Sequence, residues 1–144
     1  MIDLSARQEP GLAHIGYVVA SVEKAMKRWT AQGYETWIEP TSDPIQGVVV
    51  ALLSDGTVPV ELVSPIDAET PSPVEARLRR GGGLDHLCYY VDDVAAALEA
   101  EVEEAASMIV CEPVYAVAFE RTIGFVQRKT GLVVEYMSCE RSEQ

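Results

Sequence analysis

The stretch Leu12-Ala13-His14-Ile15-Gly16-Tyr17-Val18-Val19 decides the fold, because its pattern returns later as Leu84-Asp85-His86-Leu87-Cys88-Tyr89-Tyr90-Val91. Each stretch is rich in strand-forming residues and holds one of the two histidines of the chain. Each is followed by a Ser or Asp suited to capping a helix, and then by a helical pattern over residues 21–29 or 92–99. Such self-similarity predicts a duplicated structural unit.

Both predicted helices carry one apolar stripe, with residues spaced three and four apart. In the first helix the stripe consists of Val22, Ala25, Met26 and Trp29. The second helix nearly repeats the spacing with Val94, Ala97, Leu98 and Val102. The acidic run from Glu99 to Glu104 is interpreted as the solvated face of this second helix.

Three further strands are predicted after each helix. In the first copy they cover residues 34–39, 45–53 and 58–64, and Asp55-Gly56 marks a tight hairpin. In the second copy they cover residues 108–114, 122–128 and 132–138, with Thr130-Gly131 at the hairpin. Both copies therefore follow the order strand–helix–strand–strand–strand.

These patterns predict an α+β fold built from two tandem βαβββ modules in a single domain over residues 1–144. Module 11–64 is joined to module 84–139 by the linker 65–83, which contains three prolines, a short helical pattern over 74–78 and the run Gly81-Gly82-Gly83. The glycine run is interpreted as a hinge or linker, because no strand precedes it and no GK[ST] follows it, as a phosphate loop requires. The alternative is one α+β sheet whose halves resemble each other by chance.

The composition limits the class of partner. The 144 residues include 23 acidic and 11 basic side chains, for a formal net charge of −12, which argues against a general nucleic-acid surface. No apolar run approaches the roughly 20 residues of a membrane helix, and the first residues lack a signal-peptide pattern. The three cysteines form neither an even disulfide framework nor a CxxC motif. We expect a soluble, cytoplasmic protein without nucleic-acid or membrane partners.

Four residues at matched places in the two modules are candidate metal ligands. His14 and His86 are 72 positions apart, and a glutamate inside the last apolar strand follows each of them, Glu61 after 47 residues and Glu135 after 49. A carboxylate among apolar neighbours is costly unless it meets a cation or titrates. Two imidazoles and two carboxylates suit a divalent ion such as Co, Ni, Zn, Mn, Mg or Fe(II).

A purely structural role is the alternative for each member of this quartet. A strand histidine can be a hydrogen-bonded core residue, and a strand glutamate can face solvent because strands alternate faces. The occurrence of both residue types at matched positions of a repeat favours the metal site.

The two modules and the quartet resemble the vicinal oxygen chelate superfamily, which includes glyoxalases, bleomycin-resistance proteins and extradiol dioxygenases. The resemblance extends from about Gly11 to Ser138 and is greatest to methylmalonyl-CoA epimerase-like proteins. It rests on the runs Asp85-His86-Leu87-Cys88, Val91-Asp92-Asp93-Val94, Glu61-Leu62-Val63-Ser64-Pro65 and Val133-Val134-Glu135. It implies a curled mixed sheet around a cavity, one divalent metal ion per chain held by His14, Glu61, His86 and Glu135, and a homodimer.

The resemblance also implies a metal-dependent isomerase or epimerase that acts by proton transfer on a small carbonyl or acyl-thioester substrate. Glu135 would be the catalytic base. The second carboxylate of such epimerases is expected after the run Gln46-Gly47-Val48-Val49, where this sequence has Val50. A glyoxalase I-like lyase is one alternative, and a small-molecule-binding or resistance protein without turnover is another.

Arg121 is the candidate substrate-binding residue, since it lies directly before the predicted strand 122–128, which would face the cavity. Its guanidinium could bind a substrate carboxylate or phosphate through two hydrogen bonds. An ion pair at the surface with Glu120 or another acid is the alternative.

Overall fold

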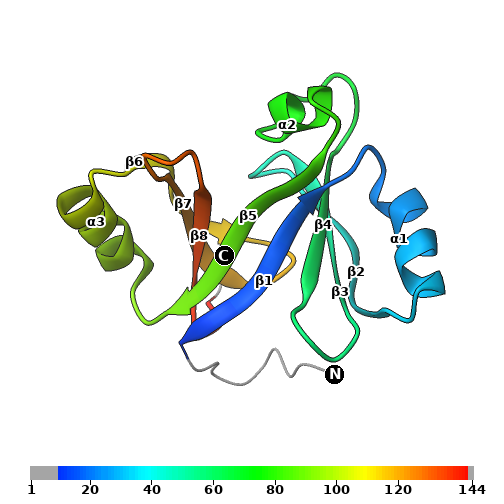
Figure 1. The fold of residues 1–144 in the computed structure, drawn as a ribbon, viewed down its shortest axis with the longest axis horizontal. Coiled ribbons are helices and arrows are strands. Elements are labelled where there is room, and N and C mark those ends of the chain that lie inside the picture. The colour runs from blue at the N-terminus through cyan, green and yellow to red at the C-terminus, as the bar shows by residue number, and fades with distance from the viewer. Residues whose placement is uncertain (1–9, 143–144) are drawn as a thin grey trace. The chain divides into compact units, whose positions relative to one another are not determined.

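The computed structural model describes residues 10–142 and shows the predicted order of elements twice (Figure 1). The first set comprises β1 (Gly11–Val18), α1 (Val22–Ala31), β2 (Glu35–Asp43), β3 (Val48–Ser54) and β4 (Val60–Pro65). After α2 (Glu75–Arg79), the second set comprises β5 (Gly83–Val91), α3 (Val94–Ala105), β6 (Met108–Ala116), β7 (Arg121–Gln127) and β8 (Val133–Ser138). The predicted α+β class with a repeated βαβββ pattern is confirmed.

The described residues form two compact units, one of residues 14–85 and the other of residues 10–13 and 86–142. In the first unit β1 pairs in parallel with β4, and β4, β3 and β2 follow one another in antiparallel pairs. In the second unit β5 pairs in parallel with β8, and β8, β7 and β6 follow in the same way. The two units thus share one strand order.

Helix α1 covers one face of the strands in the first unit. Ser21 caps the helix by accepting a hydrogen bond from the backbone N–H of Lys24, at 3.3 Å. Val22 packs into a cluster with Ala51, Leu53, Val60 and Leu62, and the rest of the predicted stripe packs against that cluster. The Trp29 ring packs edge to face with the rings of Tyr17 and Tyr34, with centroids 5.5 and 4.9 Å apart.

Helix α3 covers the corresponding face of the second unit, but its stripe differs from the prediction at one place. Val94 and Leu98 pack with Val126 and Val134 as expected. The next buried residue of the helix is Glu101, whereas Val102 is 41 % exposed. The interpretation of Glu101 as solvated is therefore wrong, because its carboxylate accepts hydrogen bonds from Arg128, Tyr136 and Ser107 beneath the helix.

The glycine run before β5 has a packing role at Gly82. The backbone φ of Gly82 is +74°, and a Cβ placed there would lie 2.6 Å from the carbonyl oxygen of Val18. Only glycine fits so close an approach without a shift of the backbone. Among residues 10–142, no helix is long and apolar enough to cross a membrane.

Candidate metal centre

The first histidine–glutamate pair lies on the face of the first unit that α1 leaves uncovered. In the parallel pairing of β1 with β4, Gly16 is opposite Glu61, so His14, two residues earlier, shares the face of Glu61. His14 Nε2 lies 3.5 Å from Glu61 Oε1. Both side chains are buried, with 1 % and 5 % of their surfaces exposed.

The second pair repeats this arrangement in the second unit. Cys88 of β5 is opposite Glu135 of β8, which places His86 on the same face as that glutamate. His86 Nε2 lies 3.0 Å from Glu135 Oε1, and both residues are buried. The rings of His86 and Phe125 pack edge to face, with their centroids 5.2 Å apart, which helps to fix the orientation of the imidazole.

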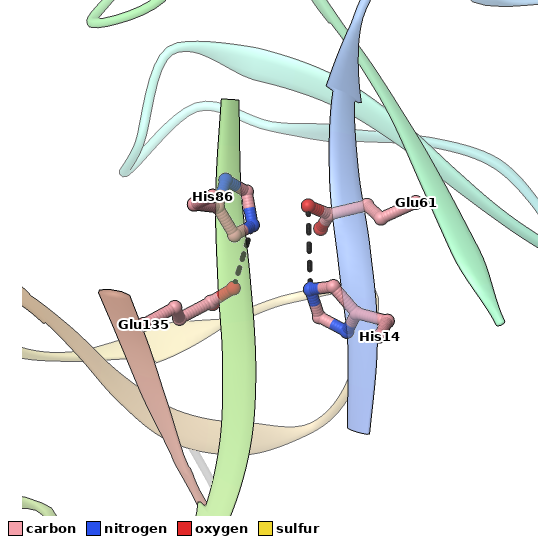
Figure 2. Close-up of side chains that lie close together, drawn as sticks. All are labelled: His14, Glu61, His86 and Glu135. Atoms are coloured by element: carbon pink, nitrogen blue, oxygen red, sulfur yellow. Dashed lines mark ion pairs between the residues drawn. The ribbon is translucent and has the colours of Figure 1, made fainter. Parts of the chain in front are cut away.

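Figure 2 shows both pairs, each joining a histidine of the first strand of its unit to a glutamate of the last. The alternative that these glutamates face solvent is wrong, since both carboxylates are buried. A buried carboxylate is costly unless positive charge or hydrogen bonds compensate it. Imidazole nitrogen and carboxylate oxygen are suitable ligands for divalent first-row metals, so the donor set fits the predicted ion.

We use the term helix-free face for the side of each unit opposite its long helix. In the first unit this face bears, besides the His14–Glu61 pair, the aliphatic side chains of Val18, Val48, Val50, Leu52 and Val63 on its three inner strands, and the buried Ser54 at the end of β3. Leu52 lies opposite Glu61, and Val50 lies opposite Val63 and is buried. Val50 is therefore on the face of the candidate ligands, but it has no group that can carry a proton.

Arg121 begins β7 on the helix-free face of the second unit and is fully buried. Its guanidinium carbon lies 5.7 Å from the ring centroid of Tyr90, and its Nη1 donates a hydrogen bond to the Phe119 carbonyl at 3.2 Å. Burial lowers the pKa of Arg121, and the nearby Tyr90 opposes this shift. Glu120 pairs with Arg141, and Arg121 is buried, so its side chain does not lie at the surface as the alternative required.

Tyr90 and Phe125 lie beside the candidate site residues of the second unit, but the sequence analysis did not propose either of them as a site residue. Tyr90 shares the face of His86 because it follows that histidine by four residues on one strand, and this alternation was visible in the sequence. Phe125 is opposite Glu135 across the β7–β8 pair, and only the register of the strands reveals it.

Comparison with known proteins finds a matching family model and related proteins. The family model described as Glyoxalase/Bleomycin resistance protein/Dioxygenase superfamily matches residues 13–125. Over 88 residues the chain is 30 % identical to the mitochondrial methylmalonyl-CoA epimerase of Bos taurus, covering 60 % of this chain and 50 % of that protein. Over 99 residues it is 27 % identical to an ethylmalonyl-CoA/methylmalonyl-CoA epimerase of Cereibacter sphaeroides, covering 68 % and 73 %. The chain thus spans about half the length of its bovine relative.

Solved structures share the fold. A hypothetical protein from Bacillus halodurans superposes with a TM-score of 0.76 at 25 % identity, covering 95 % of this chain and 98 % of that one. The methylmalonyl-CoA epimerase of Mycobacterium tuberculosis superposes with a TM-score of 0.73 at 23 % identity, covering 96 % and 92 %. At that identity the second likeness shows the fold alone.

Proposed function

Because this chain belongs to the glyoxalase/bleomycin resistance protein/dioxygenase superfamily, we propose that it is a metal-dependent enzyme of the isomerase or epimerase type. It moves a proton next to the carbonyl group of a small acyl-thioester or related substrate. The observation that carries the proposal is the buried histidine–glutamate pair, which occurs once in each unit at equivalent positions. The names of two relatives, both epimerases of coenzyme A thioesters, support the substrate class.

In this proposal the two pairs hold one divalent ion. His14, Glu61, His86 and Glu135 would each supply one ligand atom. The ion would be Co, Ni, Zn, Mn, Mg or Fe(II), which all accept imidazole and carboxylate ligands. When bound, it would supply Lewis-acid stabilisation of negative charge on a substrate carbonyl oxygen.

Glu135 is the proposed base. A carboxylate can remove a proton from the carbon next to a carbonyl and return it, provided that the carboxylate is held close to that carbon. The contact of Glu135 with His86 and its position opposite Phe125 restrict its rotation. Since Val50 cannot carry a proton, the chain's own residues support proton transfer through Glu135 on one face of the substrate.

The remaining parts of the proposal follow from the family resemblance. The two modules 11–64 and 84–139, with linker 65–83, act as one domain, because a shared ion needs ligands from both. We also propose a homodimer, located in the cytoplasm.

The test is a comparison of Glu135→Gln with Glu101→Gln, since both replace a buried carboxylate of the second unit. The full chain is purified without chelator, its metal content is measured, and deuterium uptake into methylmalonyl-CoA is followed in D2O. We expect about one metal ion per wild-type chain and rapid deuterium uptake. Glu135→Gln should lower both the metal content and the rate of uptake. Glu101→Gln should leave both unchanged when they are expressed per folded chain. Metal binding without deuterium uptake would instead indicate a binding protein without turnover.

A further inference from the structure

The first unit contains a second candidate site, a pocket between α1 and the strand β1 beneath it. The pocket has a volume of about 260 Å³, and its walls come from one side of the helix and from the end of the strand: Tyr17, Val19, Ala25, Arg28, Trp29 and Gln32. We call it the α1 pocket. All six residues belong to the first unit. Tyr17 is three residues from His14 on β1, so the pocket and the candidate metal ligands lie on opposite faces of that strand.

The floor of the α1 pocket is aromatic and held in place. Trp29 packs edge to face with Tyr17 and with Tyr34, and these two contacts restrict the rotation of the indole. Trp29 and Tyr17 are both half-buried. Apolar walls with a few polar groups are typical of small-molecule sites, and drug-sized ligands occupy roughly 300–1,000 Å³. A pocket of about 260 Å³ therefore suits a smaller ligand with a single ring.

Arg28 and Gln32 supply the polar groups of the pocket. They are four residues apart on α1, which places their Cβ atoms about 5–6 Å from each other on one side of the helix. Within residues 10–142 neither side chain has a hydrogen-bond or ion-pair partner. A guanidinium and a neighbouring amide can donate hydrogen bonds to the same carboxylate, and the bonds from the guanidinium are charge-assisted.

The charge of α1 favours an anion although the whole chain is acidic. The helix carries three basic side chains and one acidic side chain, which leaves a formal charge of +2 in a chain of −12. The carbonyl groups at the end of a helix contribute only about half a negative charge, and Arg28 stands in that last turn. The positive side chains therefore exceed the charge of the helix end.

The repeat shows that this chemistry is not needed to pack a helix on the strands. With the offset of 72 residues that relates His14 to His86, the residues of α3 equivalent to Arg28, Trp29 and Gln32 are Ala100, Glu101 and Glu104. Helix α3 nevertheless covers its strands through Val94 and Leu98. The aromatic ring and the cation are thus features of the first unit, and the two glutamates in their place would repel an anion.

We propose that the α1 pocket binds a small aromatic carboxylate, with its ring against Trp29 and its carboxylate hydrogen-bonded to Arg28 and Gln32. The size of the pocket, its aromatic floor and its unpaired donors each match one part of such a ligand. This site goes beyond the proposed function. It involves neither the metal ion nor the proton transfer, because it lies on the other face of β1.

The first experiment uses the full chain after removal of metal by a chelator, with benzoate as the probe. The indole N–H signals are followed by nuclear magnetic resonance, and Trp29→Phe identifies the signal of Trp29. Trp37 does not line the pocket, so its signal is the internal control. We expect a saturable shift of the Trp29 signal with benzoate and at least about tenfold weaker binding of benzamide, its neutral counterpart. Absence of a saturable shift in the millimolar range of benzoate would overturn the proposal.

The second experiment repeats the titration with variants. Arg28→Gln should weaken benzoate binding by about tenfold or more, whereas Arg28→Lys should retain part of the affinity. Arg79→Gln is the matched control, because Arg79 is also an exposed arginine in the last turn of a helix of the first unit, and it should bind benzoate like the wild type. Equal affinities of Arg28→Gln and wild type would refute the role of Arg28. Since Arg28 is exposed, its replacement leaves the packing of the helix intact.

Ala25→Leu tests the pocket itself by filling it, and should abolish the binding of benzoate and of benzamide. Unchanged binding in this variant would place the ligand elsewhere and overturn the proposal. The affinity read from the Trp29 signal should be the same before and after metal is returned to the chain. A Trp29 shift that requires the metal would contradict a site on the α1 face. A chain that binds benzoate at Trp29 but lacks metal-dependent activity would refute the proposed function and leave the α1 pocket standing.

Discussion

Glu101 and Arg128 form a two-point ion pair between α3 and the end of β7, with Arg128 Nη2 2.9 Å and Nε 3.2 Å from Glu101 Oε2. Tyr136 donates a third hydrogen bond to Glu101 Oε2 at 2.6 Å, and Ser107 donates one to Oε1 at 2.8 Å. This carboxylate occupies the position of the helix stripe that an apolar residue would usually fill.

The ion pair predicts a pH-dependent contribution to stability. The hydrogen bond from Arg128 lowers the pKa of Glu101, so the stabilisation is complete above the pKa of the unfolded chain and is lost as pH falls through the folded value. We expect Glu101→Gln to cost about 1–2 kcal/mol of unfolding free energy at neutral pH, a range reduced because Arg128 is partly exposed. Denaturant unfolding of both proteins from pH 7 to pH 3 checks this, and a difference that grows on acidification would contradict it.

The close approach of Gly82 to Val18 predicts that a side chain at position 82 destabilises the fold. Gly82→Ala places a Cβ against the Val18 carbonyl at a positive φ, and we expect a loss of more than about 2 kcal/mol. Gly81→Ala is the matched control, because its φ is also positive but no atom lies within 4 Å of the added Cβ. Thermal unfolding should rank Gly82→Ala well below Gly81→Ala. Equal midpoints would mean that the backbone adjusts freely at residue 82.

The absence of a proton-carrying group at Val50 leads to a prediction about the stereochemical course of the reaction. Starting from one epimer of methylmalonyl-CoA in D2O, the wild-type chain should incorporate deuterium faster than it inverts the centre, because only Glu135 exchanges the proton. Val50→Glu should increase inversion relative to exchange, whereas Val50→Gln, similar in shape but unable to act as a base, should not. Chiral chromatography with mass spectrometry gives both rates. Inversion by the wild type at the rate of exchange would show that another residue supplies the second base.

If Glu61 is a metal ligand, its substitutions should lower the metal affinity by different amounts. Glutamine keeps a carbonyl oxygen at the same reach, and the family resemblance places glutamine or glutamate at this position. We therefore expect Glu61→Gln to retain metal with weaker affinity and Glu61→Ala or His14→Ala to lose at least about tenfold more. Competition titration with a chelating dye measures this order. Identical affinities for Glu61→Ala and wild type would exclude Glu61 as a ligand.

The repeat explains how much of the fold the sequence could predict. Because each βαβββ pattern supports the other, the order of elements was predicted correctly, and the four matched histidines and glutamates are buried. The helix stripe failed at Glu101, since its partners Arg128 and Tyr136 are 27 and 35 residues away and no local spacing reveals them. The predicted strand start at Ile45 was wrong for a local reason. Asp43 accepts hydrogen bonds from the N–H groups of Ile45 and Gln46, which holds a turn until β3 begins at Val48.

The packing of Trp29 against Tyr17 and Tyr34 has a practical consequence. Trp29 and Trp37 are the two tryptophans of the chain, and both belong to the first unit. Tryptophan fluorescence therefore reports on the first unit alone. A probe of the second unit, such as a label on Cys111, would then reveal whether the two halves melt together and whether an added ion makes them do so.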